Sequence, residues 1–126
     1  MTMELLGLVL LGGAIGAMSR LAITTAQTRW THWPAWTGTL AANLLGCLLV
    51  GLAAGLASDT HWIHALAVTG FCGAMTTFSS FALDMAMMVL VRAWAQLTAC
   101  ILLSVAGGVP LVWAGLQLAA SMGAAQ

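Results

Sequence analysis

Four long apolar segments, separated by short connectors, account for nearly the whole chain. A transmembrane helix needs about 20 consecutive, mostly apolar residues to cross the hydrocarbon core of a bilayer. Segments of this kind run over residues of about 5–26, 34–57, 62–91 and 96–122. We therefore predict an all-α membrane protein in which four transmembrane helices form a single integral membrane domain over residues 1–126.

The scarcity of charge supports a lipid environment. Only 5% of the 126 residues are charged, whereas charged residues make up about 25% of an ordinary soluble domain. The net charge is zero and the chain has no basic run, which argues against a nucleic-acid partner. Paired carboxylates, a nucleophile beside a base and a Gly-rich phosphate loop are all missing, so we do not expect an enzyme. The three cysteines lie in apolar surroundings and are interpreted as packing residues.

The third apolar segment contains a polar interruption, GFCGAMTTFSSFALD, at residues 70–84. Gly70 and Gly73 each disfavour a continuous helix by about 1 kcal/mol relative to alanine. We predict a break between Gly73 and Thr77, which frees backbone groups in the middle of the membrane. Such groups are tolerated only where protein, water or an ion satisfies them. Carbonyl groups at the end of a half-helix are well suited to a small cation.

Beyond the predicted break, polar side chains line one face of the helix. At about 100° per residue, Thr77, Ser80 and Asp84 fall within a sector of about 60°. Phe81 lies beside this stripe, and Phe78 lies about 60° further round. Hydroxyl groups and the edges of aromatic rings carry partial positive charge, so the stripe favours an anion over a cation. Core packing is the ordinary role of two phenylalanines, but the neighbouring break and hydroxyl groups favour the anion role here.

Polar residues elsewhere in the membrane leave alternatives open. Thr39 and Asn43 share a helix face, where they act either as hydrogen-bonding groups between helices or as donors to an anion. Ser104 either extends a track of hydroxyl groups or bonds to its own helix. Arg20 and Asp84 are costly in a membrane, and the sequence does not decide whether they pair with each other.

Rows of small residues occur in the first two segments. Glycines recur there at a spacing of four residues, namely Gly12 with Gly16 and Gly51 with Gly55. Such rows are typical of closely packed membrane helices.

Three motifs resemble the Fluc (CrcB) family of small fluoride channels, and the resemblance extends over nearly the whole chain. They are GGAIGAMSR in the first segment, GTLAANLLGCLLVG in the second and GFCGAMTTFSSFALD in the third, the last being the most specific. The resemblance implies a broken third helix and an antiparallel, dual-topology homodimer with two fluoride pores. It also implies a structural sodium ion at the dimer interface, bound by the backbone carbonyl groups of Gly73 and Thr76 from each subunit.

The same resemblance implies roles for individual side chains. Phe78 and Phe81 match the aromatic pair whose ring edges face the fluoride path, and Asn43 matches the pore asparagine. Arg20 matches an arginine of the electropositive vestibule. The positions that match the hydroxyl track are Thr39, Thr77, Ser80 and Ser104.

At two positions the chain departs from the family pattern. Asp84 stands where the family often has glutamate, and its shorter side chain has less reach. Many relatives have a tyrosine near the position of Cys100, so the track of this chain lacks one hydroxyl group.

We therefore expect a passive, fluoride-selective channel in the cell inner membrane that exports fluoride from the cytoplasm and protects against its toxicity. The alternative is a proton-coupled exporter of the small multidrug resistance type. That chemistry needs a membrane-embedded carboxylate, and the only glutamate, Glu4, lies at the start of the first segment. A non-transporting scaffold would leave the Thr-Thr-Phe-Ser-Ser-Phe sequence unexplained.

Overall fold

The computed structural model describes residues 2–57 and 60–123 and consists almost entirely of helices. Four helical segments are long and apolar enough to cross a membrane, and they are Met3–Trp30, Trp36–Leu56, His61–Leu90 and Trp94–Gly123. The predicted all-α membrane architecture with four spans is therefore confirmed. The first helix extends further than its apolar segment and ends only at Trp30.

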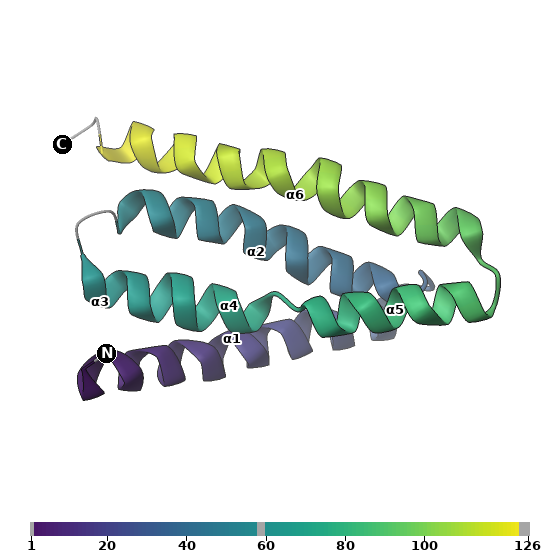
Figure 1. Cartoon of the computed structure of the whole chain (residues 1–126), viewed down its shortest axis with the longest axis horizontal. Coiled ribbons are helices and arrows are strands. Elements are labelled where there is room, and N and C mark those ends of the chain that lie inside the picture. Colours follow the sequence, from purple (N-terminus) through teal and green to yellow (C-terminus); the bar gives the residue numbers. More distant parts are fainter. Residues whose placement is uncertain (1, 58–59, 124–126) are drawn as a thin grey trace.

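The four spans pack as two pairs of parallel helices. They are α1 (Met3–Trp30), α2 (Trp36–Leu56), a third span composed of α3 (His61–Ile63), η1 (His64–Cys72), α4 (Gly73–Met75) and α5 (Phe78–Leu90), and finally α6 (Trp94–Gly123). Figure 1 shows α1 and the third span running in one direction and α2 and α6 in the other. The most extensive packing joins α2 to α6 and α1 to η1. Each close pair therefore consists of helices that point the same way.

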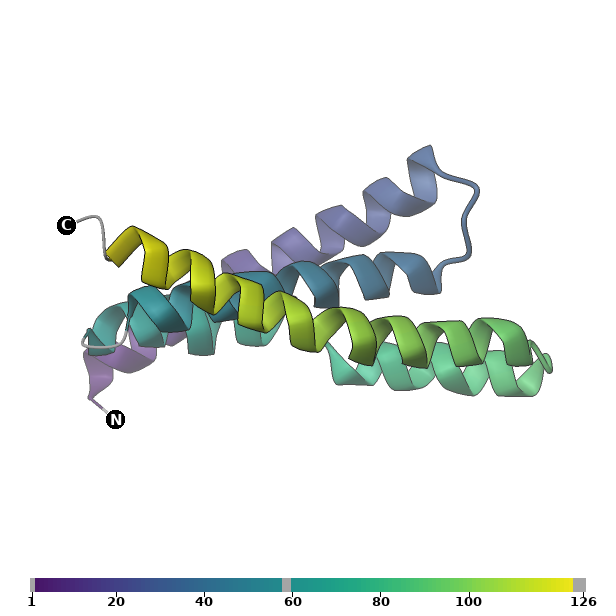
Figure 2. The same cartoon turned by 90° about the horizontal axis from the view of Figure 1, so that it is seen from above.

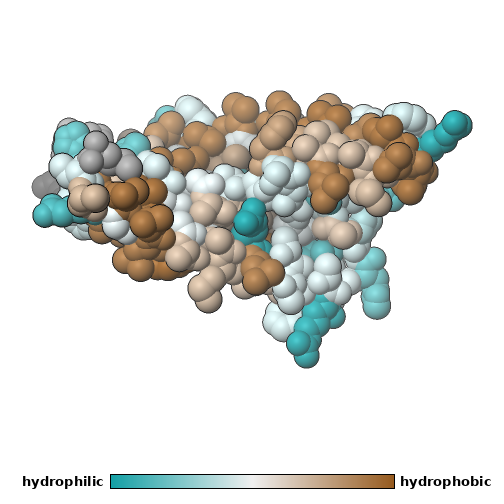
Figure 3. All heavy atoms as spheres, turned by 60° about the horizontal axis from the view of Figure 1, so that its bottom comes forward, coloured by the Kyte–Doolittle hydropathy of each residue, from teal (hydrophilic) through white to brown (hydrophobic). Residues whose placement is uncertain are grey.

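At one end of the bundle the helices separate. Figure 2 shows the second half of α1 and the connection to α2 diverging from α5 and α6. On α5, which packs against α6 and α2, the side chains of Leu83, Met87 and Leu90 remain exposed. The face in Figure 3 carries large apolar patches, with hydrophilic residues at its ends and a hydrophilic spot near its middle. A surface of this kind is suited to lipid or to another protein chain.

Glycines allow both parallel pairs to approach closely. A Cβ atom added to Gly16 of α1 would collide with the backbone carbonyl of Phe71 in η1. A Cβ atom added to Gly51 of α2 would collide with the carbonyl of Val112 in α6. The predicted packing role of the glycine rows is therefore confirmed.

The third span is broken where the sequence predicts. The helix ends at Met75, and Thr76 and Thr77 adopt extended backbone conformations with φ/ψ of −80°/148° and −146°/117°. Helix α5 then resumes at Phe78. The π-helical winding of η1, in which each turn is wider than in an α-helix, is a feature that the sequence did not predict.

Candidate functional site

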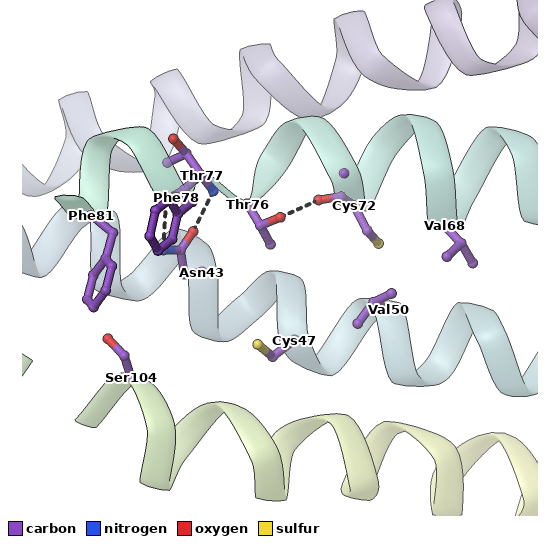
Figure 4. Close-up of a pocket in the computed structure, with 11 residues that line it drawn as sticks. Asn43, Cys47, Val50, Val68, Cys72, Thr76, Thr77, Phe78, Phe81 and Ser104 are labelled. Carbon is purple, nitrogen blue, oxygen red and sulfur yellow. Dashed lines mark hydrogen bonds between the residues drawn. The ribbon is translucent and has the colours of Figure 1, made fainter. Parts of the chain in front are cut away.

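Asn43 of α2 holds the break in the third span. Its side-chain oxygen Oδ1 accepts a hydrogen bond of 2.8 Å from the backbone N–H of Thr77. Its Nδ2 donates a hydrogen bond of 3.3 Å to the carbonyl of the same residue (Figure 4). The amide thus satisfies both backbone groups of an extended residue, as a neighbouring β-strand would. Of the two interpretations that the sequence left open, hydrogen bonding between helices is the one observed. The second N–H of Nδ2 is still available to another acceptor.

Thr77 also caps the helix that follows the break. Its Oγ1 accepts a hydrogen bond of 3.2 Å from the backbone N–H of Ser80. Ser80 is the third residue of α5, and the N–H at this position is the usual donor to an N-cap side chain. The same hydroxyl donates to Oγ of Ser80 at 3.2 Å and lies 3.1 Å from Oγ of Ser79. A network of three hydroxyl groups therefore forms at the start of α5.

The rearranged bonds leave particular carbonyl groups free. In a continuous α-helix the N–H of Thr77 would donate to the carbonyl of Gly73, and that of Ser80 would donate to the carbonyl of Thr76. Here Asn43 accepts the first N–H and the hydroxyl of Thr77 accepts the second. The carbonyl oxygens of Gly73 and Thr76 therefore lose their helical donors. Oxygen atoms of this kind are the ligands that hard cations prefer.

A cavity of about 470 Å³ opens beside the break, between α2, the third span and α6. The rings of Phe78 and Phe81 border it with their centroids 6.2 Å apart and their planes tilted by 49°. Phe78 is 79% exposed within the single chain. The remaining lining residues are Asn43, Cys47, Val50, Val68, Cys72, Gly73, Thr76, Thr77 and Ser104.

Most of the predicted site residues meet at this cavity, but three do not. Ser80 is hydrogen-bonded to Thr77 but does not line the cavity. Thr39 is buried on α2, and Arg20 is half-buried on α1. No ion pair forms within residues 2–57 and 60–123, so Arg20 does not pair with Asp84. The Oδ2 atom of Asp84 is buried without a hydrogen-bond partner.

Ser104 bonds to its own helix, which is one of the two roles that the sequence left open. Its hydroxyl donates a hydrogen bond of 2.7 Å to the carbonyl of Cys100 in its own helix. The side chain also lines the cavity, where its oxygen remains available as an acceptor.

Two cysteines that were not predicted as site residues also line the cavity. Cys47 follows Asn43 by one helical turn, and Cys72 precedes Thr76 by four residues. Residues four apart on a helix share a face, so this spacing was the signal that could have identified both. Their apolar surroundings instead favoured a packing role.

The cap at Thr77 gives a first prediction. We expect Thr77→Ala to lower the stability of the protein by about 1 kcal/mol, because the N–H of Ser80 loses its acceptor. Thr77→Ser keeps the hydroxyl and is expected to behave like the original protein. Thermal unfolding in detergent, followed by circular dichroism, measures the difference. Equal midpoints for the alanine and serine variants would contradict the capping role.

Comparisons with known proteins identify the family of the chain. The family model described as CrcB-like protein, Camphor Resistance (CrcB), matches residues 7–116. A protein of Phenylobacterium zucineum (strain HLK1) named fluoride-specific ion channel FluC is 43% identical over 124 residues, which cover 93% of this chain and 96% of the relative. The fluoride-specific ion channel FluC 1 of Nocardia farcinica (strain IFM 10152) is 39% identical over 113 residues, covering 90% of this chain and 79% of the relative.

A third relative, a fluoride-specific ion channel FluC of Pseudomonas putida (strain KT2440), is 38% identical over 122 residues, covering 90% of this chain and 95% of the relative. Both the family model and these relatives span nearly the whole chain. The chain therefore belongs to the CrcB family.

Proposed function

We propose that this protein is a passive, fluoride-selective channel and not an enzyme, and that it exports fluoride across the cell inner membrane. The observation that carries this proposal is the polar break in the third span, with two phenylalanine rings and a cavity beside it. Relatives that match nearly the whole chain bear the name of fluoride-specific ion channels. Export of the ion down its electrochemical gradient would protect the cell against fluoride toxicity.

Hydrogen-bond donors at the break support an anion path. Fluoride is small and strongly hydrated, so it leaves water only where protein donors replace its hydration shell. The second N–H of Asn43 is available, and so is the O–H of Ser80, whose oxygen accepts from Thr77. The edges of Phe78 and Phe81 add weak positive potential. The proposed path follows these groups together with Thr39, Thr77 and Ser104, and Arg20 contributes positive charge at its entrance.

A second copy of the chain is part of the proposal. The ring of Phe78 is 79% exposed although it borders the candidate site, so the site of one chain is open on one side. The exposed apolar face of α5 offers a surface for a partner. We infer an antiparallel homodimer in which this face is covered and each subunit completes a separate fluoride path.

A sodium ion is proposed at the break. The carbonyl oxygens of Gly73 and Thr76 lack their helical donors and fit a hard monovalent cation. No group of three or more His, Cys, Asp or Glu residues in the described part of the chain could hold a metal ion, so the backbone is the available ligand set. A cation bound there would balance the partial negative charge of these oxygens and hold two subunits together.

The exporter alternative is not favoured. A proton-coupled exporter needs a carboxylate within the membrane that alternates between a proton and its substrate. Glu4 is exposed in the first turn of α1, which leaves Asp84 of α5 as the carboxylate within a described span. The relatives are named as fluoride-specific channels and not as exporters, and this is what disfavours the alternative.

Flux through liposomes tests the channel proposal. We expect the purified protein to release fluoride rapidly and chloride negligibly, as read with ion-selective electrodes. Phe78→Ile and Phe81→Ile should each reduce fluoride release strongly, because isoleucine lacks the positive ring edge. Phe71→Ile is the matched control, because Phe71 lies outside the cavity. The proposal is wrong if protein that size-exclusion chromatography shows to be folded releases no fluoride, or releases chloride equally well.

A further inference from the structure

Gly46 of α2 lies against the break in the third span. It is buried and follows Asn43 by three residues, so the two positions share the face of α2 that meets the break. A Cβ atom added to Gly46 would collide with the γ-methyl carbon of Thr76. Asn43 binds the backbone of Thr77, the next residue of the break. Helix α2 therefore contacts both extended residues, one through an amide and the other at a position without a side chain.

The side chain of Thr76 is fixed from two directions. Its hydroxyl donates a hydrogen bond of 3.0 Å to the carbonyl of Cys72, which also accepts the backbone N–H of Thr76 at 3.0 Å. Figure 4 shows the hydroxyl bonded to this carbonyl. The methyl group fills the space that a side chain at Gly46 would need. Side chains adopt staggered rotamers, and rotation of Thr76 to either of the other two would break the bond of its hydroxyl to Cys72.

This arrangement bears on the sodium ion proposed above, because the Thr76 carbonyl oxygen is one of its two proposed ligands in each chain. We propose that Gly46 is a positioning residue for the sodium site. By leaving room for the methyl group of Thr76, it keeps the side chain on Cys72 and thereby fixes the direction of the Thr76 carbonyl. The role rests on the proposed sodium site and requires no contact between Gly46 and the ion. Groups that orient a metal ligand typically change metal affinity by about 10- to 100-fold when they are replaced.

Gly46→Ala is the direct test. The new methyl group forces Thr76 either to rotate, and so to lose its bond to Cys72, or to move together with its backbone. Thr76→Ser removes the obstructing methyl group and keeps the hydroxyl, so the double variant should regain the original arrangement. Gly55→Ala is the matched control on the same helix, because its added Cβ atom would meet Ala119 of α6 and not the break.

The measurement is the unfolding temperature in detergent at increasing sodium chloride, with N-methylglucamine chloride keeping the ionic strength constant. The protein is purified without sodium. We expect sodium to raise the unfolding temperature of the original protein, because a bound ligand stabilises the folded state. Gly46→Ala should need about 10- to 100-fold more sodium for half of this effect. Gly55→Ala should unfold at a lower temperature with an unchanged sodium requirement, and the double variant should return close to the original requirement.

The outcomes separate the role of Gly46 from the sodium site itself. An unchanged sodium requirement in Gly46→Ala, or a raised one that Thr76→Ser does not correct, would overturn the positioning role and leave the sodium site standing. If sodium does not stabilise the original protein, both the site and the role of Gly46 are wrong. None of these outcomes depends on fluoride conduction.

A second readout applies if Gly46→Ala yields too little folded protein for the sodium titration. The recovery of monodisperse protein from size-exclusion chromatography is then compared between Gly46→Ala and the double variant. Recovery that Thr76→Ser restores, with the original sodium requirement in the double variant, would support the role of Gly46. Recovery that stays low would overturn it, because the collision with the methyl group would not be the cause of the defect.

Discussion

Gly16→Ala and Gly51→Ala are each expected to destabilise the protein by about 1–3 kcal/mol, the usual cost of overpacking. The new methyl groups would collide with the carbonyls of Phe71 and Val112, and these are backbone atoms that cannot rotate away. In the double variant both parallel helix pairs are forced apart, so we expect little folded protein. The fraction of protein that remains monodisperse in detergent after heating, measured by size-exclusion chromatography, reports the effect.

Gly7→Ala is the matched control for these variants. Gly7 lies on the same helix as Gly16, but an added Cβ atom would have no neighbour within 4 Å. Alanine is a better helix former than glycine by about 1 kcal/mol, so this variant should be as stable as the original protein or more so. The sign of the change therefore separates close packing from helix propensity. Gly16→Ala with unchanged heat resistance would contradict the close contact between α1 and η1.

The spans and the break could be predicted because both depend on local composition. Apolar length defines a membrane helix, and the run from Gly73 to Thr77 combines a glycine with two β-branched threonines, which are poor helix formers. The break lies at the two threonines, as the extended conformations of Thr76 and Thr77 demonstrate. The π-helical winding of η1 was not predicted, because such windings are rare and no residue type specifies one.

The function of Asn43 required the tertiary structure. Thr77, its partner, is 34 residues away in the sequence, and helical periodicity describes only neighbours within one helix. The sequence could therefore place Asn43 on a face with Thr39 without showing what that face meets. The same limit applies to the pairing of parallel helices, since the order of apolar segments does not specify which of them pack together.

Asn43→Leu is expected to have the largest effect on conduction among variants that keep the overall fold. Leucine is similar in size but would leave the N–H and the carbonyl of Thr77 without partners beside the break. An unsatisfied buried polar group costs about 1–3 kcal/mol. The extended backbone at the break should therefore rearrange so that these groups find other partners. We expect fluoride efflux from liposomes to be nearly lost, together with a lower unfolding temperature.

Asn43→Asp separates the structural role of Asn43 from its role as a donor to an anion. A carboxylate can still accept the hydrogen bond from the N–H of Thr77, but it can neither donate to the Thr77 carbonyl nor offer an N–H to fluoride. Its negative charge would also repel the anion beside the phenylalanine pair. We therefore expect Asn43→Asp to unfold at a higher temperature than Asn43→Leu and yet to release fluoride as slowly. Rapid release by the aspartate variant would mean that Asn43 only secures the break, and that fluoride takes its hydrogen bonds from other donors such as Ser80.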